Sequence, residues 1–243
     1  MTSSPPPCHP WLATGLTLYL TAAVFLSLRG FLRNAPSLPA SMHERIGQWM
    51  KTRLASFEPL LVRLGVRPDI LTFAQLGMSI MAGIAYAGGY IFLGGWLMLG
   101  CGVLDLLDGG LARRTTQTTR RGAFHDSVID RYAEFFTFCG LGVFFSSSWM
   151  LGVVAFGFLG SMMVSYTRAR AEGLGVEYRG ELMQRGERYV LLGVSSFLST
   201  VLNQLSCRST HSLLMAGLVL LAVLANLTAL SRVRVVIAAL REQ

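Results

Sequence analysis

Charged side chains are scarce in this sequence. Asp, Glu, Lys and Arg make up 14% of the 243 residues, while hydrophobic residues make up 52%. Soluble domains carry about 25% charged residues, and here the apolar residues also fall in long runs. The composition therefore excludes an ordinary soluble domain and predicts an all-α integral membrane protein.

Cysteine is also rare, and its four positions follow no functional pattern. Cys8, Cys101, Cys139 and Cys207 have neither the spacing of a metal site nor that of a redox pair. Cys101 and Cys139 lie in apolar runs, where a free cysteine behaves as a small hydrophobic residue. We expect both to be core residues.

Acidic residues are fewer than basic ones, 13 against 21, which gives a formal net charge of +8. With six core spans that start from the cytoplasm, every Lys and Arg except Arg208 falls on one side, as expected for the cytoplasmic side. This surface would attract anionic lipids or anionic substrates. Nucleic acid is not an expected partner, because the basic residues follow the membrane boundaries and no soluble reading module is present.

Seven apolar runs come near the roughly 20 residues that a membrane-spanning helix requires. The six expected core spans follow an extra N-terminal run; in order, the seven are Trp11–Leu28, Ile70–Tyr90, Ile91–Leu111, Ala123–Phe145, Trp149–Tyr166, Tyr189–Leu205 and Ser212–Leu230. The first run has no basic segment before it, so it is interpreted as a possible extra anchor and not as a cleaved signal peptide. Asp69 is a candidate N-cap of the first core span, and Gly88-Gly89-Tyr90 is a candidate tight turn after it.

An amphipathic segment precedes the first core span. Between Met42 and Leu64 the apolar residues recur at helical spacing, which predicts a helix at the membrane surface, bent or interrupted at Pro59. We therefore expect an N-terminal extension over residues 1–40, this juxtamembrane helix over 41–67, and a six-helix domain over 68–243.

Four aspartates lie between two of the apolar runs. Asp105 and Asp108 are three residues apart, and Asp126 and Asp130 are four apart, so each pair lies on one face of its helix. Four carboxylates near a membrane need either protons or cations, and hard cations such as Mg²⁺ suit them best. Glu134 continues the second acidic stripe, as a metal helper or as a hydrogen-bonded structural residue. His125, beside Asp126, is expected to be a spectator.

The complete pattern around these aspartates is Asp-x-x-Asp-Gly-x-x-Ala-Arg-x8-Gly-x3-Asp-x3-Asp. Every defined position is met, by Asp105, Asp108, Gly109, Ala112, Arg113, Gly122, Asp126 and Asp130. This pattern resembles the signature of the CDP-alcohol phosphotransferases, also called CDP-alcohol phosphatidyltransferases, and the resemblance covers roughly residues 42–235. It implies a six-helix membrane enzyme, usually a homodimer, that transfers a phosphatidyl group from CDP-diacylglycerol to an alcohol and releases CMP.

The resemblance also implies roles for individual residues. Asp105, Asp108, Asp126 and Asp130 would hold two divalent ions, Mg²⁺ or Mn²⁺, and Asp130 would also be the general base. The CDP site would be lined by Asp105, Gly109, Ala112, Arg113 and Gly122. The expected location is the bacterial inner membrane, with the active site facing the cytoplasm.

The acceptor is less closely defined by the sequence. Ser165–Glu172 is similar to the corresponding segment of family members that use phosphorylated acceptors, the phosphatidylinositol phosphate and phosphatidylglycerophosphate synthases. Arg168, Arg170, Arg185 and Arg188 are therefore candidates for binding the acceptor phosphate, because guanidinium groups bind phosphate bidentately. Boundary arginines that snorkel to the interface are the alternative explanation.

Two other classes of protein also place acids among membrane helices. An ion transporter does so, but it does not require Gly, Ala and Arg at these offsets. A membrane prenyltransferase uses aspartates with Mg²⁺, but in a different pattern. Both remain alternatives to the transferase at this point.

Overall fold

Helices are the only regular elements in the part of the chain that the computed structural model describes, which is residues 52–115, 119–176, 183–206 and 211–241. The elements are α3 (Glu58–Arg63), α4 (Pro68–Ala87), α5 (Ile91–Arg114), α6 (Arg120–Phe144), α7 (Met150–Gly173), α8 (Arg185–Ser206) and α9 (Ser212–Arg241). The predicted all-α class is confirmed. The possible anchor at Trp11–Leu28 and the extension over residues 1–40 lie outside the described residues.

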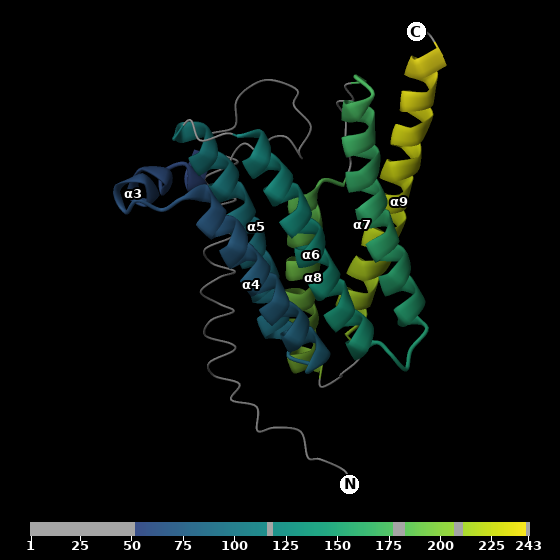
Figure 1. Cartoon of the computed structure of the whole chain (residues 1–243). Helices are drawn as coiled ribbons and strands as arrows, with labels where there is room; N and C mark the ends of the chain where they lie inside the picture. The colour runs from purple at the N-terminus through teal and green to yellow at the C-terminus, as the bar shows by residue number, and fades with distance from the viewer. Residues whose placement is uncertain (1–51, 116–118, 177–182, 207–210, 242–243) are drawn as a thin grey trace, which may run out of the picture. The chain divides into compact units, whose positions relative to one another are not determined.

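Each of the six predicted core spans corresponds to one helix, from α4 to α9 (Figure 1). Four of these, α4, α5, α7 and α9, are long and apolar enough to cross a membrane. The length and composition of these four helices are those of an integral membrane protein. Helix α6 is more polar, because its first half carries the aspartate pair and several arginines.

The start of α4 differs from the prediction. Its N-cap is Arg67, in extended conformation, and Pro68 occupies the first turn, where its missing N–H costs nothing. Asp69 lies inside that first turn and is not the N-cap, so this detail was wrong. The turn after α4 is as predicted, because Gly89 has a φ of 78°, which glycine adopts without strain.

The amphipathic segment is interrupted near Pro59. A helical segment ends at Leu54, and α3 begins at Glu58 with the proline in its first turn. The part of the predicted helix before residue 52 lies outside the described residues. Phe57, Leu60 and Leu64 are more than half exposed, which suits a segment at a membrane surface.

Helix α4 is the central packing element for the aspartate-bearing helices. It contacts both α5 and α6 along much of its length, whereas α5 and α6 make little backbone contact with each other. Helix α8 packs against α5 and α9, and α7 packs against α9 and α6 (Figure 1). The space between α5 and α6 is therefore bounded by α4 on one side and α8 on another.

Small residues let α4 and α6 approach closely. A Cβ atom added at Gly83 would collide with the Phe136 carbonyl, and one added at Gly140 would collide with the Gly83 backbone. Such close backbone contact is common between membrane helices. The hydrophobic effect does not drive helices together inside lipid, so their association depends on the van der Waals packing that small residues permit.

The two cysteines in the helices differ in environment. Cys101 is fully buried in the main apolar cluster, as predicted. Cys139 is exposed on α6, so its prediction as a core residue was wrong. An apolar run alone does not say which face of a membrane helix points toward lipid.

Candidate active site

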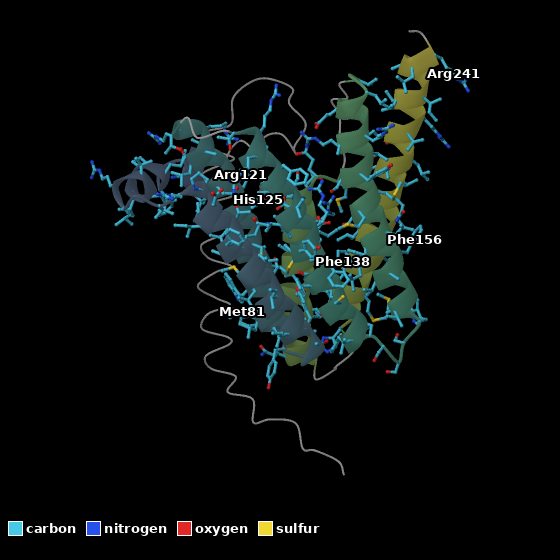
Figure 2. The ribbon with its side chains drawn as sticks, viewed as in Figure 1. Met81, Arg121, His125, Phe138, Phe156 and Arg241 are labelled. Atoms are coloured by element: carbon cyan, nitrogen blue, oxygen red, sulfur yellow. The ribbon has the colours of Figure 1, made fainter. Side chains whose placement is uncertain are left out.

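The four aspartates come together at one end of the helical bundle. Asp105 and Asp108 lie in the C-terminal half of α5, and Asp126 and Asp130 lie in the first turns of α6. Arg121 and His125, on the same turns of α6, mark this end in Figure 2. Asp130 is fully buried and Asp108 nearly so.

The carboxylates lie close enough to act on one another. Asp105 and Asp126 both exert a repulsive electrostatic interaction on Asp108, and the same two act on Asp130. Such a group needs compensating positive charge. The structure therefore brings together the four residues that the sequence singled out.

Arg185, in the first turn of α8, lies between the two aspartate pairs. Its Nη1 atom donates to Asp105 Oδ1 at 2.7 Å and is also ion-paired with Asp130 Oδ2. One guanidinium thus bridges α5 and α6 at the position where the repulsion between their carboxylates requires a cation.

The donor set also fits divalent cations. All four candidate ligands offer carboxylate oxygens, which hard ions such as Mg²⁺ prefer. Asp126 Oδ1 is buried and accepts no hydrogen bond in the described structure, an unusual state for a carboxylate unless a cation binds it. Within the described ranges, no three acidic, histidine or cysteine side chains are already gathered as metal ligands. Two of the carboxylates, Asp105 and Asp130, instead face the bridging Arg185.

Two polar residues on α4 that the sequence analysis did not single out also contact this group. Thr72 Oγ1 donates to Asp108 Oδ2 at 3.2 Å, and Gln75 Nε2 donates to Asp130 Oδ1 at 3.3 Å. Both side chains are buried. Their spacing of three residues in an otherwise apolar run places them on one helical face, and that spacing was the available signal.

The residues proposed for the CDP site lie on the same two helices. A Cβ atom at Gly109 would lie 3.4 Å from Arg113 Nη1, so the guanidinium covers this glycine. The backbone N–H of Gly122 donates to the Thr119 side chain at 3.0 Å and thereby caps α6. Ala112 is half-buried and Arg113 is exposed, which leaves the arginine accessible to a soluble nucleotide.

Three of the four candidate phosphate-binding arginines pair with different acids. Arg188 is buried; its Nη2 donates to Glu134 Oε1 at 2.5 Å and its Nη1 donates to the Met183 carbonyl at 2.9 Å. Arg168 pairs with Glu172 at 2.9 Å, and both side chains are more than half exposed. Arg170 is also exposed. Of these four arginines, Arg185 is the one that contacts the aspartates directly in the described part of the chain.

Several neighbouring residues have a clearer structural role. Glu134 pairs with Arg188, which agrees with the structural alternative predicted for it. His125 is exposed on α6, consistent with a spectator. Arg232 on α9 is fully buried and donates to the Val164 carbonyl and to Thr167 on α7, so it joins these two helices.

A shallow depression lies on the exposed face of α6. It is lined by Arg131, Tyr132 and Phe135. Arg131 Nη1 donates to the Ser127 carbonyl at 2.5 Å and lies 3.9 Å from Asp130 Oδ2. The aspartates themselves do not line this depression, so we place the chemistry between the helices and not there.

Comparison with known protein families gives one match. Residues 66–240 match the family model described as CDP-alcohol phosphatidyltransferase. The matched region contains α4 to α8, all of α9 except its last residue, and all four aspartates.

Two curated relatives extend this finding. The archaetidylinositol phosphate synthase of Methanothermobacter thermautotrophicus is 30% identical over 135 residues, which is 56% of this chain and 68% of the relative. The phosphatidylinositol phosphate synthase of Streptomyces avermitilis is 31% identical over 168 residues, which is 64% of this chain and 67% of the relative.

The fold is also similar to that of a solved enzyme. The crystal structure of Mycobacterium tuberculosis phosphatidylinositol phosphate synthase with CDP-DAG bound has a TM-score of 0.63 and 26% identity, over 75% of this chain and 92% of that chain. The same enzyme in complex with manganese and citrate has a TM-score of 0.65, with 75% of this chain and 88% of that chain covered.

Proposed function

Because this chain belongs to the CDP-alcohol phosphatidyltransferase family, we propose that it transfers a phosphatidyl group from CDP-diacylglycerol to a phosphorylated polyol and releases CMP. Family membership makes it a transferase of phospholipid synthesis and removes the prenyltransferase and cation-transporter alternatives. The observation that carries the proposal is that Arg185 bridges Asp105 and Asp130, while Asp108 and Asp126 lie close enough to interact electrostatically with this group.

The aspartates are proposed to hold two divalent ions, Mg²⁺ or Mn²⁺. The mycobacterial relative has been crystallised with manganese, and the orphan oxygen of Asp126 supports the same class of ligand here. Ions bound there would stabilise negative charge on the attacked phosphate and on the departing CMP.

Asp130 is proposed to be the general base. The acceptor hydroxyl oxygen attacks the lipid-side phosphorus of CDP-diacylglycerol, and the bond from that phosphorus to the oxygen bridging to CMP breaks. Asp130 takes the hydroxyl proton, and CMP leaves with the bridging oxygen. Burial of Asp130 among helices excludes bulk water from this proton transfer.

The CDP moiety is proposed to bind along Asp105, Gly109, Ala112, Arg113 and Gly122. Small residues at three of these positions allow the nucleotide to approach the helix backbone. The exposed guanidinium of Arg113 could then donate charge-assisted hydrogen bonds to a phosphate of the CDP moiety.

The acceptor is proposed to carry a phosphate, and an inositol phosphate is favoured over glycerol 3-phosphate by the names of the relatives. Arg185 is the candidate that lies nearest to the chemistry, since it already contacts Asp105 and Asp130. Arg168, which pairs with Glu172, and Arg170 are both exposed and could meet an anion from the aqueous side. Arg188 supports Arg185 from three residues farther along α8.

The membrane arrangement forms part of the proposal. We place α4 to α9 as six spans over residues 68–243, residues 41–67 at the interface, and the aspartate end toward the cytoplasm of a bacterial inner membrane. A homodimer is the proposed assembly.

A purified-enzyme assay tests the function. CMP release from CDP-diacylglycerol is measured with inositol phosphate, glycerol 3-phosphate, free inositol, free glycerol and serine as acceptors. We expect a phosphorylated polyol to support by far the fastest release. If a free alcohol or serine is the best acceptor, the proposal of a phosphate-binding acceptor pocket is wrong, although the proposed phosphatidyl transfer would still hold.

A further inference from the structure

A buried polar cluster joins three helices beside the aspartates. Gln75 of α4 donates through Nε2 to Asp130 Oδ1 on α6 at 3.3 Å and to the Tyr189 hydroxyl oxygen on α8 at 3.1 Å. Gln75 and Asp130 are 0% exposed and Tyr189 is 2% exposed. Neither Gln75 nor Tyr189 belongs to the aspartate signature.

The two oxygens of Asp130 have partners of different kinds. Oδ1 accepts from the neutral amide of Gln75, while Oδ2 faces the guanidinium of Arg185. A hydrogen bond from a neutral amide fixes the orientation of a carboxylate without adding a charge to the site. Gln75 thus binds the one oxygen of Asp130 that the two arginines, Arg185 and Arg131, do not contact.

Tyr189 in turn has little freedom to move. It packs against α5, where a Cβ atom at Gly102 would lie 3.3 Å from the Tyr189 Cβ. Gln75 is therefore held by a side chain that is itself anchored, and the chain of contacts runs from α5 through α8 and α4 to Asp130.

Burying Gln75 has a cost that packing alone does not explain. Its Oε1 atom is buried and accepts no hydrogen bond in the described structure, and an unsatisfied buried polar atom costs free energy. A methionine would fill a similar volume in this apolar helix without that cost. Polar groups retained at such a cost inside membrane helices commonly serve function.

We propose that Gln75 is a positioning residue for the reaction: it holds the Asp130 carboxylate in the orientation that accepts the acceptor's proton, and Tyr189 holds Gln75. This inference rests on the proposed function, because it assigns Gln75 a role only through Asp130 as the general base.

The test compares four purified proteins, namely wild type, Gln75→Met, Tyr189→Phe and the double variant, with Ser79→Ala as a matched control. Ser79 lies one turn farther along α4, is fully buried, and pairs with Cys101 away from the aspartates. CMP release gives kcat and the two KM values, thermal unfolding gives Tm, and the electron paramagnetic resonance of free Mn²⁺ gives the metal affinity.

We expect Gln75→Met to lower kcat about tenfold, since one hydrogen bond to a charged group is lost, with both KM values, Tm and Mn²⁺ affinity close to wild type. Tyr189→Phe should lower kcat less, and the double variant should be no slower than Gln75→Met, because both residues act on one carboxylate. Ser79→Ala should keep the wild-type kcat.

Three results would overturn the proposal: wild-type kcat in Gln75→Met, an equal loss in Ser79→Ala, or loss of Mn²⁺ binding in Gln75→Met, since the metal site would then have been dismantled. If Gln75→Met does not fold, Tyr189→Phe decides, and wild-type kcat there also overturns it. Failure of the proposed function is distinguishable, because wild type would then release no CMP with any acceptor.

Discussion

Arg188 and Glu134 form an ion pair at 2.5 Å, and both side chains are at least 95% buried. The pair joins the first turn of α8 to α6 and also ties α8 to the Met183 carbonyl. Arg185, three residues before Arg188, is thereby held facing Asp105 and Asp130. A buried pair thus fixes the helix that presents the bridging guanidinium.

Breaking this pair should destabilise the protein. Glu134→Gln leaves a buried guanidinium without its counter-charge, so we expect a loss of about 3–5 kcal/mol in the free energy of unfolding. The double variant Glu134→Gln/Arg188→Met should recover part of that loss, because no unpaired charge remains. Thermal unfolding in detergent measures both, and a single variant as stable as wild type would contradict the pairing.

Removal of divalent ions should abolish turnover. Excess EDTA is expected to stop CMP release, and added Mg²⁺ or Mn²⁺ should restore it, because the four aspartates repel one another and the developing charge on CMP needs a cation. Full activity in EDTA would show that Arg185 alone compensates these carboxylates.

Asp130→Asn should impair the chemical step. An amide of nearly the same shape cannot take the acceptor's proton, so kcat should fall by about 10² or more, with the KM for CDP-diacylglycerol nearly unchanged. His125→Ala is the matched control on the exposed side of the same helix and should remain active. An active Asp130→Asn enzyme would assign the base role to another group.

Replacing Arg185 and replacing Arg168 should affect the KM for the acceptor to different extents. Arg185→Ala is expected to raise the KM for the phosphorylated acceptor about 10- to 100-fold, the equivalent of a charge-assisted hydrogen bond. Arg168→Ala removes an exposed pair with Glu172 and should change that KM less than about fivefold. The reverse order would move the acceptor phosphate to the end of α7.

The sequence predicted much of the fold because membrane helices are specified by local composition. Apolar runs located α4 to α9, although α7 and α9 continue 7 and 11 residues past the predicted ends because segments that contain arginines extend them. The Gly88-Gly89 turn could be predicted because left-handed backbone favours glycine. The boundary at Asp69 was misplaced, since a proline in the first turn and an acidic cap give the same local signal. The wrong prediction for Cys139 has another cause: in lipid, apolar residues face outward as well as inward.

The site could be predicted only in part, for a related reason. The aspartates stood out because charge is rare in such helices, and their spacing carried the signature. Arg185 and Arg188 looked equivalent in sequence, yet one faces the aspartates and the other pairs with Glu134. Such differences depend on which helices meet in space, as do the roles of Thr72 and Gln75.

The position of α4 between α5 and α6 also bears on which divalent ion the aspartates would bind. Because α5 and α6 contact α4 more than each other, α4 acts as a spacer that sets the width between the two carboxylate pairs, although it supplies no ligand. Mg²⁺ requires oxygen distances of about 2.0–2.1 Å, whereas Ca²⁺ takes about 2.3–2.6 Å. We therefore expect a larger side chain along the α4 interface, for example at Gly83, where the backbones of α4 and α6 are in contact, to widen this space and to shift the preference toward a larger ion.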